Sequence, residues 1–234
     1  MPASDPGSSS QHPPCQVNLA APQKANSNNL NRHDKTLTVY CANYTSLSTI
    51  AQNTLFKKNA HIFCGVEHHK NIKYIHEVFN SHGFKVVATD PEPTDNIGID
   101  ASKSSGHGGE LVAFKSNYKY KPIEQHILDA IHATTNAPLR FAAAVMQFKG
   151  LSIIFASIYL WDKEGLSERN QNLLFQIYLL LQTTQLPIFL YGDFNMNPNT
   201  LREAGWLDKL QVVEHHPPVP TTISTSNIPL LITF

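Results

Sequence analysis

The order of strand-like and helix-like segments after Thr36 limits the fold of this chain more than any other feature of its sequence. Apolar runs rich in β-branched and aromatic residues predict strands, and Lys149-Gly150 between two of these runs is typical of a tight hairpin. Apolar residues spaced by three and four predict helices. The expected strands are 37–41, 61–66, 85–89, 109–115, 141–148, 152–160 and 187–191, and the expected helices are 46–58, 71–81 and 167–184. Hairpins mixed with strand–helix–strand units predict an α/β fold with a mixed sheet.

The first 35 residues differ from the rest in composition. They are rich in Ser, Pro, Asn, Gln and Ala and contain almost no bulky apolar residues. Such a segment buries too little apolar surface to offset the entropy of ordering, so residues 1–35 are predicted to be a disordered leader. The domain is predicted to span 36–234, with a long surface loop at 90–108, where Pro, Gly and acidic residues gather.

Charge and cysteine content exclude several classes of protein. Eighteen basic residues balance eighteen acidic ones, so the chain lacks the basic excess of a dedicated nucleic-acid binder. Three scattered cysteines are too few for a disulfide framework or a zinc cluster. A catalytic pair of Cys64 with His68 or His69 is an alternative to a buried structural thiol, but no glycine elbow supports it. No signal peptide or apolar span is evident, which predicts a nuclear or cytoplasmic protein that is neither secreted nor transmembrane and has no membrane partner.

Polar residues follow three of the predicted strands directly. Asn43, Glu67 and the pair Asp193 and Asn195 each come at or just after the end of a buried run. If these strand ends meet at one edge, they form a cluster of oxygen donors, which suits Mg²⁺ or Mn²⁺ better than zinc. Taken singly, each of these residues also fits a turn former or a partly solvated strand end.

The segment Gly-Asp-Phe-Asn-Met-Asn-Pro at 192–198 follows the buried run 187–191. Here the chain resembles the endonuclease/exonuclease/phosphatase superfamily, which includes abasic-site endonucleases, deadenylases, inositol phosphatases and retrotransposon endonucleases. Further matches occur in the family's order at Asn43, Glu67, the glycine-led strand 108–113 and the strand 157–160. The resemblance implies a four-layer α/β sandwich, in which two mixed sheets are flanked by helices.

The resemblance also implies a role for each matched residue. Glu67 and Asn43 would hold the metal ion, and Asp193 would orient or deprotonate the attacking water. Asn195 would bond the scissile phosphate, assisted by Tyr159 at the same phosphate. An Asp and an Asn two apart on an extended chain point to the same side, which agrees with these roles. The implied partner is nucleic acid, with DNA favoured over RNA, and a retrotransposon-type endonuclease is one implied origin.

The chain departs from the family's pattern near its end. Members of the family carry another strand-borne Asp and then a terminal Asp-His pair, but only residues 196–234 follow Asn195. Asp208 is the sole Asp there, and Glu214-His215-His216-Pro217 only superficially matches the terminal pattern. The fold is therefore expected to lack its last strands, leaving an exposed sheet edge.

Two hypotheses follow from the matches and the departure. The first is a metal-dependent phosphodiester hydrolase, nuclease-like and endonuclease-derived, whose turnover is reduced by the missing Asp-His pair. The second is a remnant or phosphate-binding module without turnover. The sequence leaves the choice among DNA, RNA and other phosphoesters open, and it leaves the oligomeric state open as well.

Overall fold

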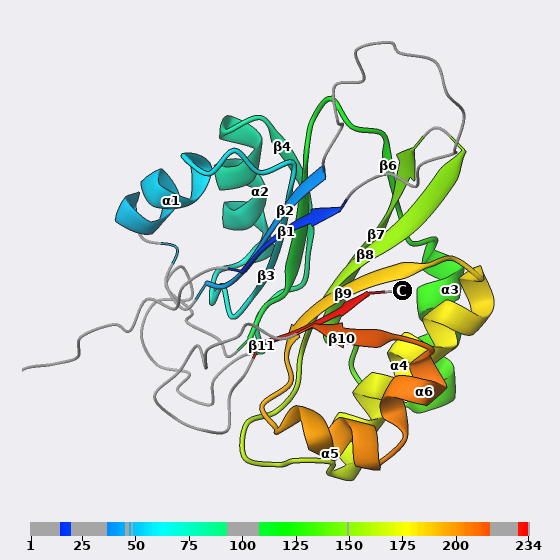
Figure 1. Cartoon of the computed structure of the whole chain (residues 1–234). Helices are drawn as coiled ribbons and strands as arrows, with labels where there is room; N and C mark the ends of the chain where they lie inside the picture. The colour runs from blue at the N-terminus through cyan, green and yellow to red at the C-terminus, as the bar shows by residue number, and fades with distance from the viewer. Residues whose placement is uncertain are drawn as a thin grey trace, which may run out of the picture.

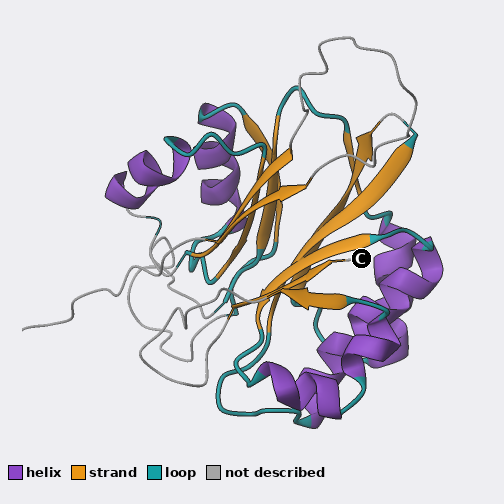
Figure 2. Ribbon diagram, in the orientation of Figure 1, coloured by secondary structure: helices purple, strands orange, loops and turns teal. Residues whose placement is uncertain are grey.

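The computed structural model describes residues 15–19, 37–44, 47, 49–92, 108–148, 150–215 and 229–233. Two β-sheets pack face to face, and helices cover the outer face of each, which gives the predicted four-layer α/β sandwich (Figure 1). The strands lie inside and the helices outside (Figure 2). No helix in the described ranges is both long enough and apolar enough to cross a membrane.

The first sheet has the strand order β1-β2-β3-β5-β4. Its strands are β1 (Cys15–Leu19), β2 (Leu37–Asn43), β3 (Ile62–Val66), β4 (Phe84–Ala88) and β5 (Leu111–Lys115). Helices α1 (Thr49–Phe56) and α2 (Ile72–Ser81) pack on its outer face. The side chain of Asn71 caps α2 by accepting from the backbone N–H of Tyr74, and Gly83, with a φ of 76°, follows its end.

The second sheet has the order β10-β11-β9-β8-β7-β6. Its strands are β6 (Tyr120–Pro122), β7 (Phe141–Phe148), β8 (Leu151–Tyr159), β9 (Ile188–Asp193), β10 (Val213–His215) and β11 (Pro229–Thr233). The predicted hairpin joins β7 and β8, with Phe148 opposite Leu151. The outer face carries α3 (Gln125–Thr135), α4 (Glu168–Thr184), α5 (Pro198–Glu203) and α6 (Trp206–Leu210).

The two ends of the chain differ from what the sequence predicts. Residues 15–19, expected within a disordered leader, form β1, which pairs antiparallel with β2. The residues CQVNL of β1 alternate between apolar and polar, a local strand pattern that the polar composition of the whole segment obscured. The rest of the predicted leader and most of the predicted loop 90–108 lie outside the described residues.

The second difference concerns the residues that follow β9. They form β10 and β11, and β11 pairs antiparallel with β9 from Pro229 opposite Asp193 to Thr233 opposite Phe189. This corrects the expectation of an exposed edge at β9, because β11 satisfies its outer backbone groups.

Candidate active site

Parallel pairing brings the polar strand ends together in two pairs. Strands β2 and β3 are parallel, with Asn43 opposite Val66, so Asn43 lies next to Glu67 just beyond β3. Strands β8 and β9 are also parallel, with Tyr159 opposite Asp193. Because β3 packs against both β8 and β9, the two pairs meet across the space between the sheets. We call the five residues the strand-end cluster: Asn43, Glu67, Tyr159, Asp193 and Asn195.

Glu67 connects the first pair. Its Oε2 accepts a short hydrogen bond from Asn43 Nδ2. Its backbone has a φ of 57°, in the left-handed region that a residue such as glutamate seldom adopts. Backbone strain of this kind is found where the surrounding fold holds a side chain in place for function.

Tyr159 connects the first pair to the second. Its hydroxyl lies near enough to the side chains of Glu67 and Asn195 for both of them to affect its pKa. Burial raises the pKa of Tyr159 above its ordinary value of 10.0, and the nearby carboxylates of Glu67 and Asp193 raise it further. The phenol therefore stays protonated, and its O–H remains available as a donor.

Asp193 and Asn195 are joined by a tight turn. The backbone N–H of Asn195 donates to Asp193 Oδ1 at 3.1 Å, and Asn195 Nδ2 donates to the carbonyl of Leu160 at 2.7 Å. Asn195 has a φ of 49° and is 5% exposed. Asp193 and Asn195 therefore do not lie on one continuous extended strand, as the sequence analysis assumed. The turn, and not strand alternation, brings them together.

Gly192 allows this turn to sit close to β8. A Cβ at this position would lie 2.7 Å from the carbonyl oxygen of Ile158 and 2.9 Å from the ring of Phe194. Only a residue without a side chain permits this approach, which gives the glycine before Asp193 a physical reason.

The remaining sequence candidates lie in structural positions. His68, one of the two histidines considered as a partner of Cys64, is fully buried, and burial lowers its pKa from 6.5 to about 4. Its Nδ1 accepts from the backbone of Lys70, and Nε2 lies 3.0 Å from the carbonyl of Thr89. Cys64 is fully buried inside β3, which favours the structural alternative over a nucleophile. Glu214 is ion-paired with Arg202 of α5.

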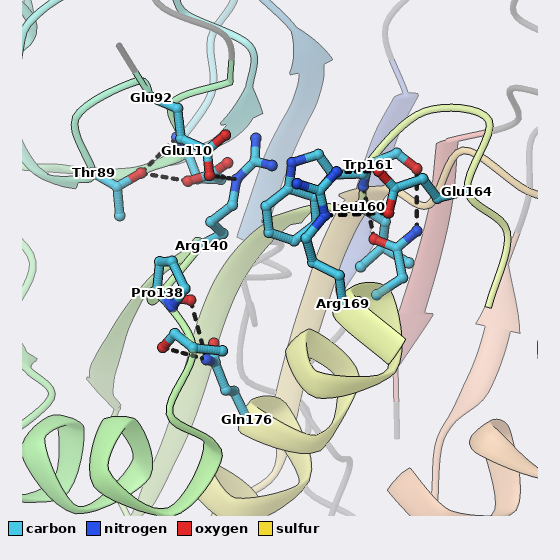
Figure 3. Close-up of polar contacts among 12 residues, drawn as sticks. Thr89, Glu92, Glu110, Pro138, Arg140, Leu160, Trp161, Glu164, Arg169 and Gln176 are labelled. Carbon is cyan, nitrogen blue, oxygen red and sulfur yellow. Dashed lines mark hydrogen bonds and ion pairs between the residues drawn. The ribbon is translucent and has the colours of Figure 1, made fainter. Parts of the chain in front are cut away.

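Sequence reasoning missed a group of charged residues beside the cluster (Figure 3). Arg140, directly before β7, is 4% exposed, and its guanidinium carbon lies 4.2 Å from the ring centre of Trp161 and 5.2 Å from that of Tyr159. Glu110, directly before β5, is 1% exposed. In the sequence, each is a single charged residue directly before an apolar run. A strand that begins at the protein surface commonly has the same pattern, so the sequence did not single these residues out.

The oxygen atoms of the cluster suit a hard divalent cation. Glu67 and Asn43 are partly exposed, and Asn195 Oδ1 is buried without a hydrogen-bond partner among the described residues. Within the described ranges, no three His, Cys, Asp or Glu side chains are grouped closely enough to enclose a metal. Mg²⁺ is commonly held by one or two carboxylates, with water and substrate phosphate completing the shell, and the donor set fits this mode.

No protein-family model matches the sequence, and no curated protein matches it either. Solved structures with a similar fold do exist. The human Nocturnin catalytic domain, solved with a bound sulfate anion, is 15% identical with a TM-score of 0.56, over 80% of this chain and 76% of that chain.

Two further structures are similar to this chain. The endonuclease domain of TRAS1, a telomere-specific non-LTR retrotransposon, is 13% identical with a TM-score of 0.52, over 83% and 84% of the two chains. An endonuclease/exonuclease/phosphatase family protein from Bacteroides thetaiotaomicron is 10% identical with a TM-score of 0.52, over 84% and 83%. The chain thus shares its α/β sandwich fold with these three structures, one of which is an endonuclease/exonuclease/phosphatase family protein.

Proposed function

We propose that this protein is a divalent-metal-dependent phosphodiester hydrolase that acts on nucleic acid. The observation that carries the proposal is the strand-end cluster. Five residues from four strand ends of two sheets come together, and the contacts that join them run through Glu67 and Tyr159. Isolated turn formers at separate strand ends would have no reason to be connected in this way.

Glu67 and Asn43 are the residues that would hold Mg²⁺ or Mn²⁺. When bound, the ion neutralises phosphate charge and lowers the pKa of bound water. The contact between the two side chains fixes the Glu67 carboxylate, so the ligand geometry is set before the ion arrives.

Asp193, Asn195 and Tyr159 act on the substrate. The carboxylate of Asp193, which the backbone N–H of Asn195 holds through Oδ1, orients and deprotonates the attacking water. Asn195 donates to the carbonyl of Leu160, which fixes the amide group beside the position where it would donate to a phosphate oxygen. The protonated Tyr159 hydroxyl donates to the same phosphate group, where charge develops in the transition state.

Nucleic acid is the substrate class with most support, and DNA is favoured over RNA. The fold is shared with the endonuclease domain of a retrotransposon and with a domain that binds sulfate, an anion similar to phosphate. A formal net charge of zero means that affinity for phosphates depends on the metal ion and on local cations.

The test is cleavage of labelled DNA and RNA oligonucleotides and of an abasic-site duplex by the full chain, with Mg²⁺, with Mn²⁺ and with a chelator. Cleavage should require the metal ion and fall at least 100-fold in Asp193→Ala. Asp208→Ala, which removes an exposed carboxylate on α6, is the matched control and should cleave normally. Cleavage unchanged in Asp193→Ala would refute the assigned mechanism.

A phosphate-binding module without turnover is the second candidate. The observation that favours it is the ion pair of Glu214 with Arg202. Glu214 begins the segment that superficially matches the family's terminal Asp-His pattern, and its carboxylate is occupied by Arg202. Binding of oligonucleotides without cleavage under any metal condition would support this candidate over the hydrolase.

A further inference from the structure

The guanidinium of Arg140 lies beside the strand-end cluster and is held from several sides (Figure 3). One face packs on the ring of Trp161, and the ring of Tyr159 lies 5.2 Å from the guanidinium carbon. Arg140 Nε lies 3.8 Å from Glu92 Oε1, which is an ion pair but too long for a hydrogen bond. These contacts fix the plane of the guanidinium and do not use the hydrogen-bond donors of its two outer nitrogens, Nη1 and Nη2.

Those outer nitrogens have no partner in the part of the chain that the structure describes. Nη1 and Nη2 are both buried and make no hydrogen bond there. Nη2 occupies space beside Gly108, where a Cβ would lie 2.4 Å from it. Buried donors without acceptors cost free energy, and an anion that accepts from both nitrogens would remove that cost.

The carboxylate of Glu110 would compete with such an anion for the guanidinium of Arg140. It is buried beside Arg140, its Oε2 accepts a short hydrogen bond from Thr89, and its Oε1 has no partner among the described residues. Burial raises the pKa of Glu110 to about 7, while the hydrogen bond from Thr89 and the charge of Arg140 oppose the rise and Glu92 adds to it. Near neutral pH, Glu110 therefore exchanges between a carboxylate and a neutral acid.

We propose that Arg140 binds a phosphate group of the substrate beside the strand-end cluster, and that the Glu110 carboxylate competes with that phosphate for the guanidinium. This rests on the proposed function, since it adds a phosphate-binding residue and a pH dependence to the same site. When Glu110 is neutral, Glu92 is the one carboxylate among the described residues that is ion-paired with the guanidinium, and Nη1 and Nη2 attract an anion. When Glu110 is ionised, its charge and that of Glu92 repel the anion.

The probe for this binding is sulfate, because its charge does not change between pH 6 and pH 8. If only the neutral form of Glu110 permits binding, the apparent Kd for sulfate rises about tenfold from pH 6 to pH 8, following the fraction of neutral acid. Titration calorimetry without divalent metal, at constant ionic strength, measures this Kd independently of turnover. An absence of cleavage activity would therefore leave the measurement meaningful.

Three variants complete the experiment. Glu110→Gln should bind sulfate equally well at both pH values and about tenfold more tightly than the wild type at pH 8. Arg140→Lys keeps the charge beside Glu110 but loses the forked donor pair, so its affinity should fall about tenfold at pH 6. Glu203→Gln, which changes an exposed carboxylate on α5, should retain the wild-type pH dependence.

The outcomes separate anion binding from a purely structural ion pair. A structural pair predicts that Glu110→Gln gains no affinity at pH 8 and that wild-type binding does not depend on pH, and either result overturns the proposal. If Arg140→Lys does not fold, Glu110→Gln still decides the question, because it tests for a gain of binding and not for a loss.

Discussion

Asn170 ties the segment after β8 to helix α4 through three hydrogen bonds. It is fully buried, and its Oδ1 accepts from the backbone N–H of Trp161 at 2.8 Å. Its Nδ2 donates to the carbonyls of Trp161 at 3.1 Å and Gly165 at 2.8 Å. We predict that Asn170→Ala destabilises the protein by about 3 kcal/mol, because each lost hydrogen bond contributes about 1 kcal/mol and leaves a backbone partner unsatisfied. For a protein of this size, the expected fall in Tm is about 6–12 °C.

The assay is urea unfolding, followed by circular dichroism and by tryptophan fluorescence, for which Trp161 is a local reporter. Gln171→Ala is the matched control, since the neighbouring Gln171 is exposed and makes one side-chain hydrogen bond, to the carbonyl of Leu166. The control should lose less than about 1 kcal/mol. A loss of less than about 1 kcal/mol in Asn170→Ala, with an unchanged urea dependence, would show that Asn170 does not anchor this segment.

Three further predictions concern the site and its surroundings. Gly192→Ala should lower the free energy of unfolding by about 1–3 kcal/mol and reduce cleavage, because the added Cβ would meet the carbonyl of Ile158. An unchanged thermal unfolding curve would contradict the close approach of the two strands. Tyr159→Phe should lower the cleavage rate constant about 100-fold while costing only about 1 kcal/mol of stability, and unchanged cleavage would remove Tyr159 from the mechanism. The raised pKa of Glu110 makes a stability contribution that is present below pH 4.5 and lost as pH rises through about 7. In Glu110→Gln, the free energy of unfolding, measured by urea unfolding across that pH range, should lack this change of about 3 kcal/mol. The lowered pKa of His68 gives the opposite slope, so the wild type must be compared with the variant at each pH, and parallel curves would refute the prediction.

Much of the sequence prediction for the fold holds because the elements are local. The strand leading to Gly192 is an unbroken apolar run, and the helix that ends at Thr184 has both apolar spacing and a capping serine at Ser167. A strand or helix is set largely by which residues lie within a few positions of each other, and this information is present in the sequence. The position of Asp193 and Asn195 directly after β9 was therefore predictable.

The tertiary structure decided how those elements meet. Parallel pairing and the packing of the two sheets join Glu67 to Tyr159, which lie 92 positions apart along the chain. Burial of Arg140 and Glu110 also depends on the packing around them, because an isolated charged residue before an apolar run fits a surface position equally well. Strand β1 lies in a segment that is polar as a whole, and its antiparallel pairing with β2 is a contact between separate segments that composition does not reveal. Sequence thus determined which residues stand at the strand ends, and only long-range packing decided which of them touch and which charges are withdrawn from water.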